Sequence, residues 1–354
     1  MKNGVLSAAA LLAVFGLLLV GCDSGPDAGG GENGGDNGGS NLSGSITIEG
    51  SSTVEPISTK AGEEFNKDYP GVNVAVSGQG TGNGFKALSK KECDVSGASR
   101  PIKASERDAC NEAGLRFYEI PVAYDGLSIV VNKANDFVDQ LTVEQLKMIF
   151  REDMAVTMWN EVDPSWPEEE ITIYAPGVAS GTHDYFREVI GKKDDKNIRS
   201  DETITLSEDD KLLVTGVKGE EFSIGFFGFS YYKENEDDLK VVPIVDPNTG
   251  EAVTPTEATI ESGEYAPFSR PLFIYVNAES YQRAEVAEFV DFYLENAAMI
   301  AEGARYVPLP AEIYAAARDR LDKDMSGTHY LDEEGEKRSG PVSDVYVEGN
   351  LISE

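Results

Sequence analysis

The sequence predicts an α/β fold, in which strands alternate with helices along the chain. Three segments carry this prediction, because in each an apolar strand runs through a loop of small residues into a helix. The loops span residues 49–54, 77–84 and 175–183. The backbone N–H groups of a helix start lack partners within the helix and carry the positive end of its dipole. An ordinary Ser/Thr N-cap is the alternative for any one loop, but three such loops together indicate an anion-binding site.

The first half of the chain holds two of these units and a third strand. Ile46 and Ile48 are the alternating apolar residues of the first strand. The second strand spans residues 72–76, and a glycine-rich turn follows it. The third strand, residues 93–97, leads to Arg100. Arginine can meet an oxyanion with two parallel N–H bonds, so Arg100 at a strand end is a candidate ligand. An ordinary surface ion pair is the alternative.

The pattern restarts at about Asn132, which indicates a second group of elements. Before it, two strands at 115–120 and 127–131 flank residues 124–126. Ser207 and Asp210 have the spacing of a capping box for a helix over 208–217. The other expected elements are helices at 54–65, 85–90, 143–151, 184–190, 284–301 and 311–321, and strands at 171–174, 224–229, 241–245 and 272–276.

The charge of the chain limits its partners. Lys and Arg number 30 against 63 Asp and Glu, a net charge of −33. Nucleic acid and anionic membrane surfaces would be repelled, so we expect no nucleic-acid partner. Carboxylates keep a surface hydrated in concentrated salt, where their repulsion is screened, and a halophilic source is our preferred explanation.

The N-terminus predicts export and anchoring. Lys2 and an apolar run to Val20 are typical of a secretory signal, here residues 1–21. The four residues that end at Cys22 resemble a bacterial lipobox, which implies that Cys22 is lipidated. We expect a flexible tether over 22–44, and a protein held at the outer, periplasmic face of the cytoplasmic membrane. A chance cysteine in an ordinary signal is the alternative.

Two further cysteines follow in this exported chain, Cys93 and Cys110. A disulfide between them would stabilise the fold by about 3 kcal/mol, and a pair of buried thiols is the alternative. The histidines, His183 and His329, are far apart in sequence and no CxxC motif occurs, which disfavours a transition-metal site.

One acidic stretch near the C-terminus has the spacing of a calcium loop. Its candidate ligands are Asp322, Asp324, Ser326, Thr328 and Glu333. In so acidic a chain we prefer a solvated acidic turn, and expect no metal.

Five motifs in order resemble the phosphate-binding proteins of the high-affinity phosphate ABC transporter. They are Gly50 to Val54, Gly80 to Lys86, Gly97 to Ile102, Asp125 to Leu127 and Ser180 to Thr182. The resemblance implies the type II periplasmic-binding-protein fold, two α/β domains joined by crossing strands. The first domain would comprise residues 45–131 plus 272–354, and the second residues 132–271.

The resemblance also implies a set of phosphate-binding residues. They are Ser52, Thr53, Val54, Thr81, Gly82, Asn83, Ser99, Arg100, Asp125, Ser180, Gly181 and Thr182. Well-studied members have Asp where this chain has Arg100, Arg where it has Pro176, and Gly where it has Asp125. We therefore expect a swap, with Arg100 as the cation and Asp125 as the carboxylate of the phosphate site. A carboxylate accepts a proton from phosphate and repels sulfate, which has none near neutral pH.

The resemblance implies a receptor that binds inorganic phosphate and delivers it to ABC permease subunits. We expect a monomer that uses no cofactor and is not an enzyme. A receptor for a sulfate-like oxyanion, a phosphatase and a tethered sensor are the alternatives. For catalysis, Ser180, His183 and Asp184 lie too close together at one helix start to align as a triad.

Overall fold

A nine-stranded sheet organises the described part of the protein, which comprises residues 42–178, 180–191 and 195–353 of a computed structural model. Its strand order is β2-β1-β3-β12-β4-β8-β6-β7, and β9 also pairs with β4. The small second sheet has the order β11-β10-β5. The strands are β1 Gly44–Gly50, β2 Val72–Ser77, β3 Val95–Ala98, β4 Phe117–Asn132, β5 Leu141–Thr142, β6 Thr172–Pro176, β7 Ile204–Ser207, β8 Ser223–Gly228, β9 Leu239–Val241, β10 Ile244–Val245, β11 Ala252–Val253 and β12 Ser269–Asn277.

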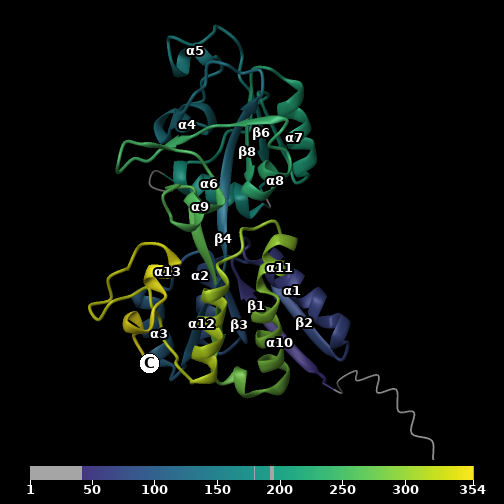
Figure 1. The fold of residues 1–354 in the computed structure, drawn as a ribbon, viewed down its shortest axis with the longest axis vertical. Helices are drawn as coiled ribbons and strands as arrows, with labels where there is room; N and C mark the ends of the chain where they lie inside the picture. The colour runs from purple at the N-terminus through teal and green to yellow at the C-terminus, as the bar shows by residue number, and fades with distance from the viewer. Residues whose placement is uncertain (1–41, 179, 192–194, 354) are drawn as a thin grey trace, which may run out of the picture. The chain divides into compact units, whose positions relative to one another are not determined.

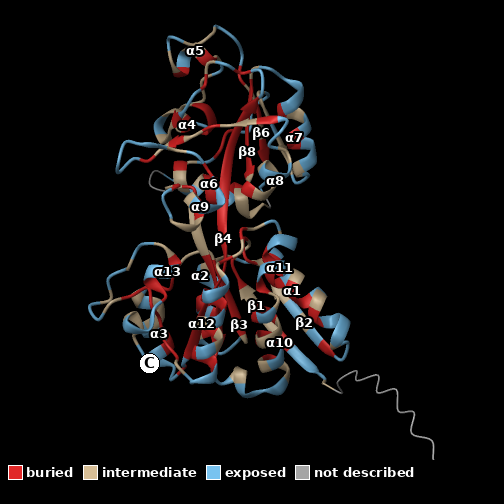
Figure 2. Cartoon of the chain, in the orientation of Figure 1, coloured by how far each residue is buried: buried red, intermediate tan, exposed pale blue. Residues whose placement is uncertain are grey.

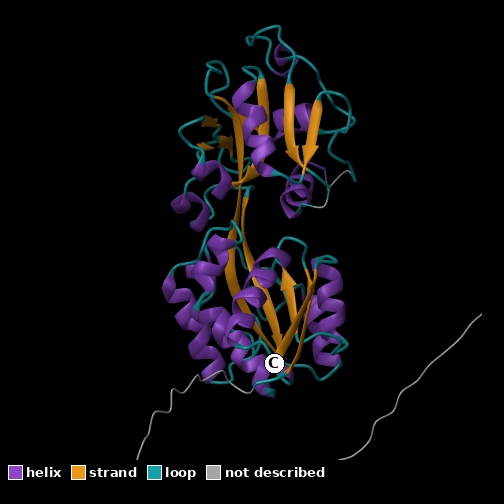
Figure 3. Ribbon diagram, turned by 90° about the vertical axis from the view of Figure 1, so that its right-hand side faces the viewer, coloured by secondary structure: helices purple, strands orange, loops and turns teal. Residues whose placement is uncertain are grey.

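Helices connect these strands and lie on either side of them (Figure 3). They are α1 Glu55–Asp68, α2 Thr81–Ser89, α3 Ala104–Glu112, α4 Val143–Phe150, α5 Trp159–Val162, α6 Gly181–Gly191, α7 Asp210–Gly219, α8 Phe229–Glu234, α9 Glu257–Glu261, α10 Ala284–Glu295, α11 Ala297–Gly303, α12 Ala311–Asp322 and α13 Val342–Val345, with 3-10 turns at Ser280–Gln282 and Glu348–Asn350. The alternation of strands and helices confirms the predicted α/β class.

Strand β4 links the two halves of the sheet (Figure 1). It pairs with β12 up to Gly126 and with β8 from Leu127. All its residues are buried, as Figure 2 shows along its length. The two strands predicted at 115–120 and 127–131 are therefore one, because the polar residues between them are buried in the strand's middle. We call the elements on the β12 side the first lobe and those on the β8 side the second lobe.

The predicted domain boundary, between residues 131 and 132, falls shortly after the point where β4 changes partner. Residues Gly39–Glu354 form one compact unit. The division into domains of 45–131 plus 272–354 and of 132–271 therefore stays a prediction.

Helix boundaries differ from the prediction in three places. Helix α2 starts at Thr81 instead of residue 85, because Gly80, with φ of 100°, turns the chain directly into the helix. At α7 the cap is Asp209, whose side chain accepts a bond from the Lys211 N–H, so the predicted Ser207 and Asp210 box does not form. The long helix predicted at 284–301 is interrupted at Asn296.

The predicted signal peptide, the lipidation site Cys22 and most of the tether lie outside the described residues. In the part that the structure describes, no helix is long and apolar enough to cross a membrane.

The disulfide predicted between Cys93 and Cys110 is wrong for this structure, which has both as buried thiols. Both pack in an apolar cluster with Phe85, Leu88 and Leu115. Burial raises the pKa of the Cys93 thiol to about 12. The two side chains thus serve as small hydrophobic residues.

The oxygens of the calcium-like stretch do not converge in the structure. Asp324 bonds the Arg116 guanidinium at 3.1 Å and also the Tyr118 hydroxyl, while Thr328 donates to the buried Glu119 at 2.6 Å. The described residues contain no group of three His, Cys, Asp or Glu placed to hold a metal ion. Through Thr328, the stretch instead contacts Glu119 on β4.

We predict that Cys93 and Cys110 resist thiol reagents in the native protein. In the Cys22→Ser chain without added reductant, Ellman's reagent should titrate almost no thiol before denaturation and two thiols afterwards. If no thiol were titrated in denaturant, Cys93 and Cys110 would form a disulfide and this prediction would be contradicted.

Candidate functional site

The loop after β1 forms the first side of the site. The Ser51 N–H donates to the Gly97 carbonyl at 2.9 Å, which holds the ends of β1 and β3 together. Gly50 has φ of 143°, and a Cβ there would lie 2.1 Å from the Gly97 oxygen, so only glycine fits. The Ser51 Oγ accepts a bond from the Thr53 N–H at 3.1 Å. This sequence therefore folds into a tight turn that presents Ser52 and Thr53.

The start of α6 forms the opposite side, from the second lobe. The Ser180 Oγ accepts a bond from the Thr182 N–H at 3.2 Å, the same two-residue turn as at Ser51. The Phe186 ring stacks on Phe226 with centroids 4.0 Å apart, which fixes the helix on β8. The Tyr185 hydroxyl donates to the Pro267 carbonyl at 2.8 Å.

The two turns touch at Gly181. A Cβ at this position would lie 2.7 Å from the Thr53 Cα, so any larger residue would push the turns apart. A 3.5 Å contact joins the Ser52 hydroxyl to Asp184. The structure thus brings together the predicted loops at 49–54 and 175–183.

A buried ion pair lies beside this contact. Asp125 on β4 and Arg270 on β12 are directly opposite in the strand register. The Arg270 Nε and Nη2 donate to the Asp125 Oδ2 at 3.2 and 3.1 Å. Among the described residues, no group donates to the other oxygen, Oδ1. Burial raises the pKa of Asp125, and the positive charge of Arg270 opposes this shift.

Arg270 also contacts the loop after β1, which we call the anion loop. Its Nη2 donates to the Thr53 Oγ1 at 3.2 Å, and its Nη1 to Glu188 at 3.1 Å. The guanidinium carbon lies 3.7 Å from the centre of the Tyr185 ring. These contacts from both lobes fix the guanidinium. Sequence reasoning missed Arg270, although it stands two residues before the apolar run that starts at Leu272.

Arg100, the predicted cation of the site, is held by a carboxylate close to it in sequence, and its role at the ligand stays a prediction. Arg100 forms a bidentate pair with Glu106, at 2.7 and 2.8 Å, and lies over the Phe85 ring. It pairs locally because Glu106, in the first turn of α3, is within reach of the strand end. Arg270 is the cation that Asp125 meets.

Two cavities flank Ser52, which lines both. The donor cavity, about 240 Å³, is lined by six of the predicted residues. These are Ser52, Thr53, Thr81, Gly82, Ser99 and Arg100. The carboxylate cavity, about 320 Å³, is lined by Ser52, Asp125, Ser180, Gly181 and Thr182. The predicted residues are therefore divided between two adjoining spaces.

The charges of the two cavities differ. Three cations line the donor cavity, namely Arg100, Lys103 and Arg270, against the two acids Asp184 and Glu188. Four acids line the carboxylate cavity, namely Glu55, Asp125, Glu208 and Asp210, against Arg305. An anion is therefore favoured more by the donor cavity than by the carboxylate cavity.

Two predicted ligands do not line either cavity by their side chains. Val54 is fully buried in the core, and its N–H donates to the Ser51 carbonyl at 3.1 Å. The Asn83 side chain donates to the Gln79 carbonyl at 2.7 Å and so stabilises its own turn. In contrast, Thr81 and Ser99 are joined at the donor cavity, because the Ser99 N–H donates to the Thr81 hydroxyl at 3.2 Å.

The residues Ser180, His183 and Asp184 do not form a triad. The Ser180 hydroxyl is engaged with the Thr182 N–H, and the His183 Nδ1 lies 4.0 Å from Asp184, beyond hydrogen-bond distance.

Comparisons with known proteins give the class and the family. Residues 35–297 match the PBP superfamily domain. The chain is 46% identical over 285 residues to protein SphX of Synechococcus elongatus, a match that covers 80% of this chain and 83% of SphX. It is 39% identical to the phosphate-binding protein PstS of Staphylococcus saprophyticus, over 79% of this chain and 85% of that protein.

Solved structures agree. A possible phosphate binding protein from Planctomyces limnophilus matches with a TM-score of 0.75 at 43% identity, over 80% of this chain and 99% of that one. An ABC-type phosphate transport receptor from Vibrio cholerae matches with a TM-score of 0.57 at 27% identity, over 75% of this chain and 100% of that one. The fold is thus that of the PBP superfamily. Within it, the chain belongs to the family that contains PstS and SphX.

We predict that the two members of the buried pair are energetically coupled. Arg270→Gln leaves the Asp125 carboxylate buried without its partner and should lower the free energy of unfolding by about 3–5 kcal/mol. Asp125→Asn together with Arg270→Gln should recover at least about 1 kcal/mol of that loss. Urea unfolding of the wild type, both single variants and the double variant measures the coupling. Strict additivity would contradict it.

Proposed function

We propose that this protein is a receptor that binds inorganic phosphate at the contact of the two lobes and delivers it to an ABC permease. Ser52, which lines both cavities, is the centre of the proposed site. Thr81 and Ser99 would add donors from the first lobe, and the Ser180–Thr182 turn would close from the second. Arg270 would supply the positive charge.

The observation that carries the choice of phosphate is the Asp125 Oδ1. It belongs to a buried carboxylate that Arg270 holds through the other oxygen. A phosphate that retains a proton can donate it to Oδ1 as a short, charge-assisted hydrogen bond. Sulfate cannot, and its oxygens would face a like charge at a cost of several kcal/mol. In this proposal, selectivity for phosphate over sulfate thus follows from the repulsion between the Asp125 carboxylate and an anion that has no proton to donate.

The alternatives need features that the site does not favour. A general oxyanion receptor would have no use for an acceptor-only group beside the ligand. A phosphatase would need an activated nucleophile, and the Ser180 hydroxyl is engaged with the Thr182 N–H. The named relatives include a phosphate-binding protein and a phosphate transport receptor, which supports a receptor.

We propose an extracytoplasmic protein anchored by lipid at Cys22, so that the tether lets the receptor reach permease subunits. The chain acts as a monomer in this proposal. The net charge of −33 supports a salt-rich environment, in which the repulsion between surface carboxylates is screened.

We predict that Asp125→Asn relaxes the discrimination between the two anions. Calorimetry in high salt should show phosphate binding by the wild type and no measurable sulfate binding. The variant should lower the ratio of phosphate to sulfate affinity by at least about tenfold, since asparagine carries no charge and offers a donor.

The matched control is Asp139→Asn, which changes the net charge equally at a side chain that is 90% exposed in the second lobe. Its ratio should equal that of the wild type. Equal affinities of the wild type for both anions would make the protein a general oxyanion receptor, and no binding of either would refute the proposed function.

We also predict that Gly181→Ala weakens phosphate binding by about tenfold or more, because its methyl group would separate the two turns. Gly219→Ala is the control, since a Cβ at Gly219 would meet nothing within 4 Å. Titration calorimetry of both variants decides the matter. Wild-type affinity in Gly181→Ala would show that the close contact is not needed.

A further inference from the structure

A third cavity, which we call the C-terminal cavity, adjoins the donor cavity. It has a volume of about 490 Å³, about twice that of the donor cavity. The two spaces share five lining residues, and the C-terminal segment from Lys337 to Pro341 lines the larger one. The shared residues are Ser99, Arg100, Tyr185, Glu188 and Arg270. An ion as small as phosphate would leave this larger space unused.

The C-terminal cavity is lined by the cations Arg100, Arg270, Lys337 and Arg338, and by the acids Glu188 and Glu261. Arg100 is paired with Glu106, and Arg270 with Asp125 and Glu188. The positive charge that this lining offers to a ligand therefore comes from Lys337 and Arg338, which is unexpected in a chain of net charge −33. Such a space attracts an anion against the field of the whole protein.

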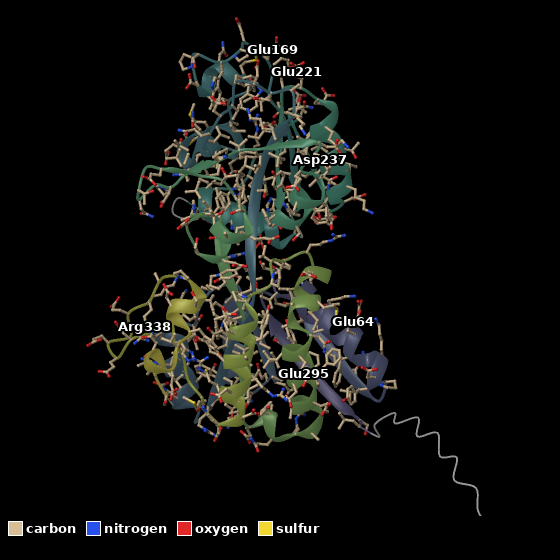
Figure 4. The ribbon with its side chains drawn as sticks, viewed as in Figure 1. Glu64, Glu169, Glu221, Asp237, Glu295 and Arg338 are labelled. Atoms are coloured by element: carbon tan, nitrogen blue, oxygen red, sulfur yellow. The ribbon has the colours of Figure 1, made fainter. Side chains whose placement is uncertain are left out.

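Two of these cations belong to the C-terminal segment, on which Figure 4 labels Arg338. The Arg338 Nη1 donates to backbone carbonyls of His329, at 2.9 Å, of Leu331 and of Asn350, which fixes the guanidinium without neutralising it. Within the described ranges no carboxylate pairs with Arg338 or with Lys337. Partial desolvation, and then the charge of Arg100, lower the pKa of the Lys337 amine. The Lys337 ammonium therefore lacks a counter-ion.

One residue that lines this space carries a buried hydroxyl without a partner. Tyr330 lines the C-terminal cavity and is only 2% exposed. Its hydroxyl has no hydrogen-bond partner among the described residues. A buried hydroxyl without a partner costs free energy, which a ligand oxygen would recover.

We propose that the C-terminal cavity is a second anion subsite, and that the protein accepts a phosphoryl group linked to a second anionic group. The first group would occupy the proposed phosphate site, on which this inference rests. The second would meet Lys337 and the Tyr330 hydroxyl. Two ligand classes share this chemistry: condensed phosphates, and phosphomonoesters that carry a carboxylate.

Calorimetry on the full chain tests the subsite with four probes. They are inorganic phosphate, pyrophosphate, 3-phosphoglycerate and glycerol 3-phosphate, which lacks the second anionic group. We expect pyrophosphate or 3-phosphoglycerate to bind at least about tenfold more tightly than glycerol 3-phosphate. The tighter of the two identifies the ligand class.

Variants locate the binding. Lys337→Gln and Tyr330→Phe should each weaken the preferred probe by about tenfold while phosphate affinity changes by less than about twofold. Tyr330→Phe removes a hydroxyl that has no partner, so folding should be preserved. Lys90→Gln, the same change of charge at an exposed position of the first lobe, should leave all affinities unchanged.

The outcomes separate the two proposals. Phosphate binding without preference for a second anionic group would overturn the subsite and leave the phosphate receptor standing. So would a preferred probe whose affinity is the same in Lys337→Gln and Tyr330→Phe as in the wild type. Failure of phosphate itself to bind would overturn the receptor and the subsite together.

Discussion

The ion pair of Asp125 and Arg270 joins the parts of this protein on which binding depends. It spans β4 and β12, the two strands that lie side by side where β4 changes partner. Removing two charges from water costs several kcal/mol for each, so the further hydrogen bonds of Arg270 help to offset the cost of burying this pair. Thr53, Glu188 and the Tyr185 ring complete the surroundings of Arg270. The anion loop, the helix of the opposite lobe and the crossing strands are thereby fixed to one another.

The local charge of the site overrides the charge of the chain. A surface with 63 acidic residues keeps the protein solvated, and at high ionic strength its field is screened within a few ångströms. Inside the cavities screening is weaker, so the charges of the lining act more strongly on a ligand than the surface charges do. The three adjoining cavities thus place a positive space beside an acidic one, with Ser52 and Arg270 near the boundary of the donor and carboxylate cavities.

The sequence predicted the elements with regular patterns and missed relations that arise only in three dimensions. The strand-to-helix loops at Ser52 and Ser180 were predictable, because the same pattern of a strand, small residues and a helix recurs along the chain. The continuity of β4 was not, since Asp125 interrupts its apolar pattern although it is buried. Arg270 was missed because its partner Asp125 lies opposite it in another strand, and the pair of Arg100 with Glu106 was not predicted. Cys93 and Cys110 are a further example, because the sequence alone does not distinguish two buried thiols from a disulfide.

We propose above all that a protonated phosphate binds between Ser52, Arg270 and the Asp125 Oδ1, the carboxylate oxygen that Arg270 does not bond. A high-resolution crystal structure of the protein with phosphate tests it most directly. The account predicts one phosphate oxygen at about 2.5–2.7 Å from the Asp125 Oδ1, as expected of a short O–H···O⁻ bond. Phosphate bound elsewhere, or bound here with no oxygen within hydrogen-bond distance of Asp125, would contradict it.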